Sequence, residues 1–514
     1  MIPTPNLAVL LDQTAARFPD RPAFIWRDET VTWARFAARV RAAAAGLAAR
    51  GVAPGDRVLV HARNSIAQLE TMWAAWRAGA VWVPTNFRLT PPEVAYLAAS
   101  SGATVHIFDA AFPDHAAAAR AANPAMGTEL WLGGGADGAA WERLAGGTDG
   151  LERPVEVGRD HPAWFFYTSG TTGRSKAAVL THGQLHFVIN NHLADLIPGT
   201  TEHDVSLVVA PLSHGAGVHA LIQVPRGAAS VLPAGERLDC AEAWALVERH
   251  RVSNMFTVPT ILTMLTRHAA VDRHDHSSLR YVIYAGAPMY RADQIHALEK
   301  LGPVLVQYYG LGEVTGAITV LPPAWHSTDD TAMAVGSCGF PRTGMEIAIL
   351  SAEGRRLPAG ETGEICVRGG AVLAEYWNNP EANEKAFAGG WFHTGDLGHA
   401  DARGLVYITG RASDMYISGG SNVYPREIEE ALLLHPAVAE ACVVGLPHPK
   451  WGEAGVAVLV VRAEVTEAAL FAHLDGRLAR YKWPVRFAVW PELPKSGYGK
   501  VAKREVRRLL EETT

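Results

Sequence analysis

Strand-like and helix-like segments alternate through the first third of the chain, and this alternation limits the fold more than any other feature. The expected strands are residues 57–61, 81–83 and 104–108, and the expected helices are residues 66–78 and 92–100. Leu69, Trp73 and Trp76 share one face of the first of these helices, as packing on a core requires. Strands alternating with helices of this length indicate parallel sheets covered by helices, so the expected fold class is α/β.

The 514 residues exceed what a single hydrophobic core normally holds, so more than one domain is expected. Short strands are expected at 364–368, 405–409, 440–445 and 456–462, and helices at 425–434 and 467–480. We expect a large N-terminal domain, residues 1–411, of helix-covered β-sheets with a small β-barrel-like subdomain. A small mobile α+β domain, residues 412–514, is expected after a hinge at residues 411–414. Residues 116–150, rich in Ala, Gly and Asp, are expected to be a surface connection.

Charge and cysteine content exclude several classes of protein. The formal net charge of -6 and a pI near 6.4 give no general attraction to nucleic acid or to an anionic membrane. No apolar run approaches the ~18 residues of a transmembrane helix, so no integral membrane segment is expected. The four cysteines are widely spaced without a CxxC pair, which favours reduced buried thiols over disulfides or a zinc site. A cytoplasmic protein is expected.

A stretch rich in hydroxyl groups and glycine, Ser169-Gly-Thr-Thr-Gly-Arg-Ser-Lys176, follows a run of aromatic residues. Glycine lets backbone N–H groups approach phosphate, the hydroxyls donate hydrogen bonds, and lysine adds positive charge. The stretch does not fit the Walker pattern GxxxxGK[ST], because Ser175 stands where the second glycine is required. A P-loop kinase or transport ATPase is therefore not expected. On this stretch alone, a polyphosphate site and a polar turn remain equally open.

Further motifs occur in a fixed order along nearly the whole chain. They are YTSGTTGRSK (167–176), PLSHG (211–215), YAGAP (284–288), QYYGLGE (307–313), GEICVRG (363–369), WFHTGD (391–396), GRASDMYISGG (410–420) and PKSGYGK (494–500). Together they resemble the acyl-adenylate-forming superfamily, which includes acyl-CoA synthetases, peptide-synthetase adenylation domains and beetle luciferases.

The resemblance implies an AMP-forming acid:CoA ligase that works in two steps. A carboxylate attacks the α-phosphate of ATP to give an acyl-adenylate and pyrophosphate, and the thiol of CoA then displaces AMP. Mg²⁺, ATP and coenzyme A are the implied cofactors and substrates, a carboxylic acid is the small-molecule partner, and fatty acid metabolism is the implied setting. An alternative is a stand-alone adenylation enzyme that loads a carrier-protein phosphopantetheine thiol, and a luciferase-like oxygenase is left to assay. The chain is expected to be a monomer or homodimer.

The resemblance also assigns roles to residues. The catalytic residues are expected to be Lys500, Glu313 and Thr171, and Glu313 and Thr171 are the expected metal ligands. The residues expected to bind ATP or AMP are Thr168, Ser169, Gly170, Thr171, Thr172, Gly173, Lys176, Gly286, Ala287, Pro288, Tyr309, Gly310, Gly312, Asp396, Ile408, Arg411 and Lys500. Asp396 is expected to accept the ribose hydroxyls, Tyr309 to stack on adenine, and Lys500 to neutralise charge at the reacting phosphate.

The acyl and thiol sites are assigned in the same way. The acyl pocket is expected to include His214, Gly215, Tyr284, Ala285, Gly310 and Leu311, and the CoA site Ser418, Gly419, Gly420, Lys450 and Trp451. The glycines of these segments are expected to make the pocket lining small and apolar, which leaves room for a medium-chain or aryl acid. The pocket segments lack arginine, which disfavours a dicarboxylate, and lack the aspartate that would hold an amino acid.

Three residues depart from the family pattern. Gly312 replaces the usual Thr, which is expected to widen the acyl pocket, Ser413 occupies the usual Asp or Lys position in the hinge, and Ser421 replaces a common Glu. None of them is the expected catalytic lysine or magnesium carboxylate, so an active enzyme is expected.

Overall fold

A computed structural model describes residues 5–133, 135–169, 174–287, 289–495 and 501–512. Its largest sheet has nine strands in the order β15-β14-β13-β12-β11-β9-β10-β1-β2. These strands are β1 (Pro22–Trp26), β2 (Glu29–Thr32), β9 (Val205–Val208), β10 (Ala229–Leu232), β11 (Asn254–Thr257), β12 (Tyr281–Tyr284), β13 (Leu305–Tyr309), β14 (Thr319–Leu321) and β15 (Phe340–Pro341). Its central pairings, from β1 through β13, are parallel, as the sequence predicts.

A second sheet has seven strands in the order β18-β8-β7-β4-β3-β5-β6. They are β3 (Arg57–His61), β4 (Val81–Thr85), β5 (Val105–Asp109), β6 (Thr128–Leu132), β7 (Pro162–Ser169), β8 (Ser175–Thr181) and β18 (Glu375–Tyr376). The expected strand at residues 57–61 is confirmed, and those at 81–83 and 104–108 match β4 and β5 within a few residues. β18 joins this sheet from far along the chain by pairing antiparallel with β8.

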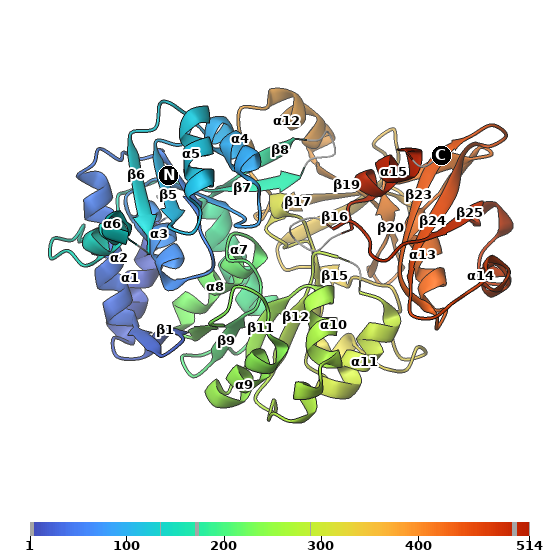
Figure 1. Cartoon of the computed structure of the whole chain (residues 1–514), viewed down its shortest axis with the longest axis horizontal. Helices are drawn as coiled ribbons and strands as arrows, with labels where there is room; N and C mark the ends of the chain where they lie inside the picture. The colour runs from blue at the N-terminus through green and yellow to red at the C-terminus, as the bar shows by residue number, and fades with distance from the viewer. Residues whose placement is uncertain (1–4, 134, 170–173, 288, 496–500, 513–514) are drawn as a thin grey trace.

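Helices cover both sheets and separate them, which gives five layers in all (Figure 1). The central helices are α1 (Ala8–Arg17), α2 (Trp33–Ala48), α3 (Ile66–Arg77), α7 (His182–Asp195) and α8 (Gly215–Gln223), and the outer helices are α4 (Pro91–Ser101), α5 (Pro113–Ala122), α9 (Cys240–His250), α10 (Pro259–Arg267) and α11 (Arg291–Leu301). Strand β3 shows why the layers form: Leu59 packs into the outer core, whereas Val58 and Val60 face the central core. Side chains that alternate in this way let one strand bury both faces.

The expected β-rich subdomain is a four-stranded antiparallel sheet in the order β16-β17-β19-β20. Its strands are β16 (Met345–Leu350), β17 (Gly363–Gly369), β19 (Phe392–Ala400) and β20 (Val406–Arg411), and α12 (Pro380–Ala386) precedes β19. In Figure 1 this sheet lies between the two large sheets and the C-terminal region.

The C-terminal region folds around its own five-stranded sheet. Its elements are β21 (Tyr416–Ser418), β22 (Ser421–Val423), α13 (Pro425–Leu433), β23 (Val438–His448), β24 (Gly452–Val461), α14 (Glu467–Leu474), β25 (Arg486–Val489) and α15 (Lys503–Glu512). Helices α13 and α14 pack on one face of this sheet and α15 on the other. The expected helix over residues 467–480 is too long, because α14 ends at Leu474 and Gly476 takes a φ of +72°.

The expectation of a plain surface connection over residues 116–150 is wrong. This stretch contains the edge strand β6 and helix α6 (Gly135–Ala145). Trp141 of α6 is fully buried, and its indole N–H donates to Glu70 Oε2 at 2.9 Å, on the carboxylate that pairs with Arg39. The many Ala and Gly residues of this stretch gave no clear helical pattern in the sequence, although Trp141 anchors α6 in the core.

Among the described residues, no helix combines the length and the apolar character needed to cross a membrane.

Replacing Trp141 tests whether α6 belongs to the core. Trp141→Ala leaves a cavity and removes a hydrogen bond to a buried carboxylate, so the free energy of unfolding should fall by about 3–5 kcal/mol in urea denaturation. Trp325, which is 42% exposed, is the control. Trp325→Ala should cost no more than about 1 kcal/mol, and equal losses for the two variants would contradict a core role for α6.

Candidate active site

Glu313 lies in the short 3-10 helix Gly312–Val314 that follows β13 and is buried, with 8% of its surface exposed. Its Oε1 accepts hydrogen bonds from the Thr168 hydroxyl at 2.7 Å and from the Tyr376 hydroxyl at 3.0 Å. A buried carboxylate requires such donors, because it has lost its hydration. Burial and the charge of Glu313 raise the pKa of the Tyr376 hydroxyl, which keeps it protonated as a donor. Sequence reasoning missed Tyr376, since only the pairing of β18 with β8 brings it here.

Lys176 joins the same cluster. It pairs with Thr168 across β7 and β8, and its Nζ lies 5.1 Å from the centre of the Tyr376 ring. An ammonium group over an aromatic face gains a cation–π attraction while its charge remains available to an anion. Three predicted residues, Thr168, Lys176 and Glu313, are therefore brought together.

Asp396 forms a second buried carboxylate centre, with 5% of its surface exposed. Its Oδ2 accepts from the Tyr309 hydroxyl at 2.7 Å, and its Oδ1 accepts from Arg411 Nε at 2.9 Å. Asp396 and Arg411 are direct partners across β19 and β20, which places both side chains on one face. Asp396 raises the pKa of the Arg411 guanidinium, and burial raises that of Tyr309.

The structure describes the positions of several residues that are predicted to contact adenine and ribose. Gly286, with a φ of +84°, and half-buried Ala287 follow β12. Ile408 is half-buried on β20. The Tyr309 hydroxyl is engaged with Asp396, and stacking of its ring on adenine stays a prediction.

Several predicted residues fall outside the described residues: Gly170, Thr171, Thr172, Gly173, Pro288 and Lys500. Ser169 is the last residue of β7.

Tyr284 does not line an accessible pocket, contrary to expectation. Its side chain is fully enclosed in the core outside the nine-stranded sheet. Its hydroxyl accepts from Gln294 Nε2 at 2.7 Å and also contacts His326 and Gln307. Ala285, the next predicted residue, is 2% exposed, whereas Leu311 remains half-buried.

The expectation that glycines leave room for the acid is also wrong. A Cβ at Gly215 would lie 2.6 Å from the Phe256 ring, and one at Gly310 would collide with the backbone of Gly316. At Gly312 a Cβ would lie 2.5 Å from the Phe166 ring and 2.9 Å from Thr168. These glycines allow aromatic side chains and backbone to pack closely, so Gly312 does not widen the pocket.

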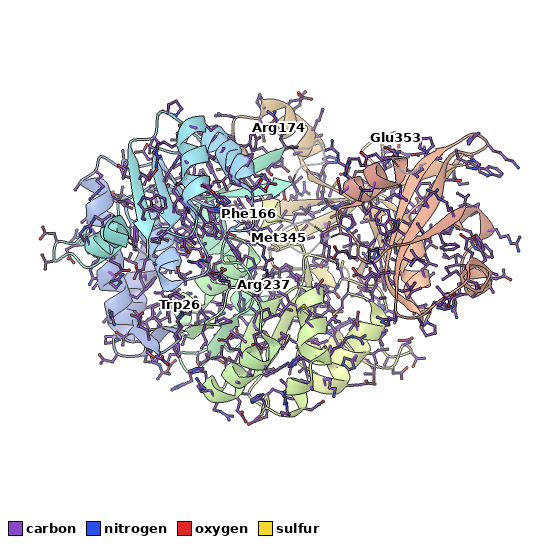
Figure 2. All side chains as sticks on the ribbon, viewed as in Figure 1. Trp26, Phe166, Arg174, Arg237, Met345 and Glu353 are labelled. Carbon is purple, nitrogen blue, oxygen red and sulfur yellow. The ribbon has the colours of Figure 1, made fainter. Side chains whose placement is uncertain are left out.

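Aromatic rings occupy this region instead. Phe166 lies near the centre of the molecule (Figure 2), and its ring centroid is 4.5 Å from that of His214, the predicted pocket histidine. Phe256 stacks on Tyr308 with centroids 6.0 Å apart. His214 directly precedes α8, so its ring stands at the start of that helix.

Arg342 is a buried cation that the motif segments do not reveal. The residue is 1% exposed, and its guanidinium donates to the Gly316 carbonyl at 3.3 Å and to His192 Nδ1 at 2.8 Å. Asp195 lies 3.9 Å from its Nε, and burial lowers the pKa of Arg342 to about 10. The predicted pocket segments contain no arginine, but the fold brings Arg342 to Gly316, a few residues after the predicted pocket residues Gly310 and Leu311.

The predicted CoA residues gather on one surface of the C-terminal region. Gly419 N–H donates to the Trp451 carbonyl at 2.9 Å, and Ser418 pairs with Gly452. Lys450 Nζ lies 4.6 Å from the centre of the Trp451 ring, which is exposed. Gly420 is exposed and takes a φ of +84°. This surface offers an exposed indole, a cation and backbone groups.

Adding a side chain at Gly312 tests the packing account. Gly312→Ala forces Phe166 or Thr168 to move, so we expect the free energy of unfolding to fall by about 1–3 kcal/mol in urea denaturation. Gly158 has open space around its Cβ position, so Gly158→Ala serves as the matched control and should be nearly neutral. A neutral Gly312→Ala would instead support an open pocket at this residue.

Two family models and several known proteins match this chain over most of its length. The AMP-binding enzyme family matches residues 11–377, and the AMP-binding enzyme C-terminal domain matches residues 427–500. A feruloyl-CoA synthase from an Amycolatopsis species is 38% identical over 93% of this chain and 94% of that protein. A fatty acid–[acyl-carrier-protein] ligase, ScoC, from Streptomyces coeruleorubidus is 33% identical over 98% of this chain and 96% of that protein.

A solved structure agrees with these relatives. The o-succinylbenzoate CoA synthetase from Bacillus subtilis, in complex with its acyl-adenylate intermediate, has a TM-score of 0.86 and 31% identity, with 99% of each chain covered. The chain therefore belongs to the acyl-adenylate-forming superfamily of AMP-binding enzymes and is an AMP-forming acyl-CoA synthetase.

Proposed function

We propose that this enzyme activates an aryl or medium-chain carboxylic acid with ATP and transfers the acyl group to CoA. The observation that carries the proposal is the pair of buried carboxylates, Glu313 and Asp396, each held by a tyrosine hydroxyl. Buried charges are retained where they bind something of opposite charge or several donors. ATP with a divalent cation meets both needs.

Glu313 is the proposed magnesium carboxylate, with Thr171 as a second ligand. Mg²⁺ prefers oxygen ligands and keeps several waters, and the donor set around Glu313 consists of carboxylate and hydroxyl oxygens. When bound, the ion would neutralise phosphate charge. Lys176 supplies a further cation from β8 for the β- and γ-phosphates, and Ser169, Gly170, Thr171, Thr172 and Gly173 are proposed to bind the same phosphates.

Asp396 is the proposed ribose site. Tyr309 and Arg411 orient its carboxylate, whose remaining lone pairs can accept the two ribose hydroxyls. In the first step a carboxylate oxygen of the acid attacks the α-phosphorus and pyrophosphate leaves. Lys500 is proposed to neutralise the charge that develops there. In the second step a thiolate attacks the acyl carbon, and AMP leaves with the carboxylate oxygen.

The two steps are proposed to use different faces of a mobile C-terminal domain. We place the domains at residues 1–411 and 412–514, with rotation at residues 411–414. One orientation brings Lys500 to the nucleotide, and the other brings the surface formed by Ser418–Gly420, Lys450 and Trp451 to receive CoA. Lys503 is not a substitute for Lys500, because its Nζ is held 2.7 Å from Glu429.

The aryl or medium-chain preference rests on the rings around the predicted pocket. Phe166, His214, Phe256 and Tyr308 offer flat apolar surface, on which an aromatic or alkyl group packs well. Arg342 donates to His192 and Gly316 and has the Asp195 carboxylate 3.9 Å from its Nε, so part of its charge is already balanced by an acid of the protein itself. The feruloyl-CoA synthase supports an aryl acid, and ScoC supports a fatty acid.

The similarity to ScoC, a fatty acid–[acyl-carrier-protein] ligase, also favours a second candidate function. In it the acyl group is transferred to a carrier-protein phosphopantetheine. The two candidate functions differ in the thiol that accepts the acyl group, which is that of CoA in the first and that of a carrier protein in the second.

A panel of acids tests the proposed substrate. We expect pyrophosphate release with aryl and medium-chain acids to exceed that with malonate or amino acids by more than about tenfold in kcat/KM, since the latter bring charges that find no partner. Each reaction is run with CoA, with holo-carrier protein and with neither. Activity confined to malonate or amino acids would overturn the pocket account, and thioester formed only on the carrier protein would replace CoA as acceptor.

Lys500→Ala tests the division of labour between the two steps. Adenylate formation should fall by at least about 10²-fold, as loss of one transition-state donor does elsewhere. Thioester formation from supplied acyl-adenylate should stay near that of the wild-type enzyme. Lys495, which pairs with Glu440 at 2.7 Å in the same segment, is the control, and Lys495→Ala should preserve both steps. Equal loss of both steps in Lys500→Ala would contradict the rotation.

A further inference from the structure

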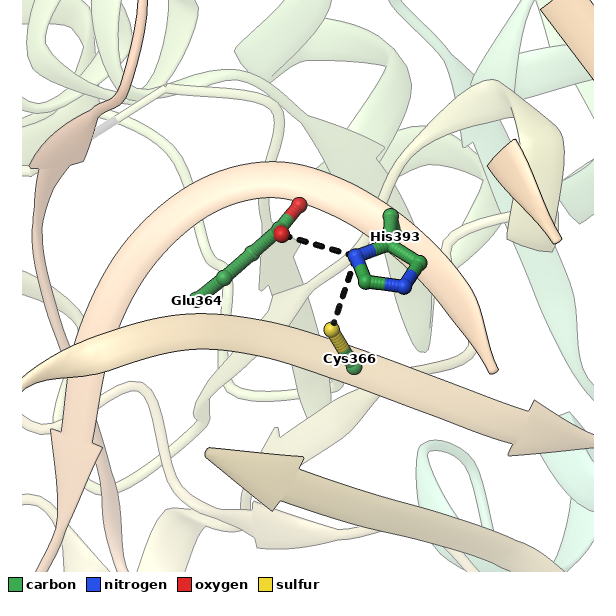
Figure 3. Close-up of side chains that lie close together, drawn as sticks. All are labelled: Glu364, Cys366 and His393. Atoms are coloured by element: carbon green, nitrogen blue, oxygen red, sulfur yellow. Dashed lines mark hydrogen bonds and ion pairs between the residues drawn. The ribbon is translucent and has the colours of Figure 1, made fainter. Parts of the chain in front are cut away.

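Three side chains with metal-ligating atoms meet between β17 and β19, outside the proposed nucleotide site (Figure 3). His393 Nδ1 lies 2.7 Å from Glu364 Oε2 and 3.4 Å from Cys366 Sγ. Cys366 and His393 are direct partners across the two strands, and Glu364 lies two residues away on the same face of β17. The three ligand atoms lie within 4.8 Å of one another.

The His393 ring lies between two oxygen acceptors. Its Nε2 is 3.1 Å from the Ala388 carbonyl and its Nδ1 is 2.7 Å from Glu364 Oε2. A neutral imidazole has one N–H, so it can donate to only one of these oxygens. If Nε2–H donates to Ala388, the Nδ1 lone pair and the Glu364 carboxylate can bind one cation together.

The ligand set and its surroundings favour a metal ion. Nitrogen, sulfur and carboxylate oxygen together suit a borderline-soft ion such as Zn²⁺ and do not suit Mg²⁺. The separation of 3.4 Å between nitrogen and sulfur fits a roughly tetrahedral ion with bonds of about 2.0–2.3 Å, and the 2.7 Å between His393 Nδ1 and Glu364 Oε2 would lengthen to about 3.4 Å when the ion binds. A thiolate and a carboxylate would balance the charge of a divalent ion.

Outer contacts orient two of the three ligands. The Ala388 carbonyl lies 3.1 Å from His393 Nε2, where it can accept a hydrogen bond from that nitrogen while Nδ1 binds the ion, and Gly395 N–H donates to Glu364 Oε1 at 2.9 Å. Protein metal sites commonly hold a ligating histidine and carboxylate by such contacts. Cys366 is buried, whereas the Glu364 and His393 side chains are 28% and 24% exposed. The site can therefore be reached from solvent, and water can complete the coordination.

We propose that Glu364, Cys366 and His393 form a binding site for one divalent transition-metal ion of the zinc type, separate from the proposed magnesium site at Glu313. Binding forms three metal–ligand bonds and releases the Cys366 thiol proton and any proton between His393 and Glu364, with no change of oxidation state. The spacing of the cysteines in the sequence could not reveal this site, because only one of its ligands is a cysteine. The other two are a carboxylate and an imidazole that the fold brings to it.

The site is coupled by position to the nucleotide carboxylate. Glu364 holds the Gly395 amide, and Asp396 is the next residue on β19. The Thr394 hydroxyl accepts the Asp396 N–H at 3.1 Å and donates to the Ile365 carbonyl at 2.6 Å. An ion that joins the two strands would therefore restrict the part of β19 that carries Asp396.

Metal binding is tested on the full-length, metal-stripped protein with Co²⁺ and Zn²⁺. We expect one Co²⁺ per chain with a sulfur-to-cobalt charge-transfer band, displacement by Zn²⁺ but not by excess Mg²⁺, and a higher melting temperature with Zn²⁺. Cys366→Ser should abolish the band and weaken Zn²⁺ binding by at least about 100-fold, because it removes a ligand rather than an outer contact.

Cys240→Ser is the matched control, since Cys240 is also buried but has no partner in this cluster, and it should keep both the band and the affinity. His393→Gln gives a second loss-of-ligand variant if Cys366→Ser does not fold, with folding checked by circular dichroism. The proposal is overturned if the wild-type protein shows no stoichiometric band, or if a folded ligand variant binds Zn²⁺ as tightly as the wild-type protein does.

Discussion

Burial of two carboxylates, those of Glu313 and Asp396, is the constraint on which the rest of the structure depends. A carboxylate removed from water is unstable unless several donors surround it. Here the donors come from strands that are far apart in the sequence. Tyr309 of the nine-stranded sheet donates to Asp396 of the four-stranded sheet, and Tyr376 and Thr168 of the seven-stranded sheet donate to Glu313. The two carboxylates can be satisfied only when all three sheets are correctly placed.

This arrangement explains how a site for a highly charged substrate can lie inside an apolar protein. The layers of helix and sheet bury aromatic and aliphatic side chains on both faces of the strands, and Glu313 and Asp396 are buried beside tyrosine hydroxyls that donate to them. Each tyrosine has its ring in the core and its hydroxyl at the site, so one residue serves both packing and electrostatics. Because the donors are fixed before the nucleotide binds, little reorganisation is needed during the reaction.

Much of this could be predicted from the sequence, and the failures have definite physical reasons. Alternating periodicity predicted the covered parallel strands, and the ordered motifs indicated Glu313, Asp396 and Lys176. Tyr376 was missed because its role depends on β18 pairing with β8, nearly 200 residues away. Gly312 was misread because a glycine can leave space or admit a neighbour, and only the position of Phe166 separates the two. The motif segments gave no sign of Arg342, since it directly follows β15 outside all of them, and only the fold brings its guanidinium to the Gly316 carbonyl.

The claim that Asp396 holds the ribose is tested most directly by comparing the affinities of ATP and 2′,3′-dideoxy-ATP for the wild-type enzyme and for Asp396→Asn. Hydrogen bonds to a charged acceptor contribute about 1.5–3 kcal/mol, so wild type should prefer ATP by more than about tenfold, and the variant should lose most of that preference. If both proteins discriminate equally between the two nucleotides, the ribose lies elsewhere, and the paired carboxylates do not define the nucleotide site.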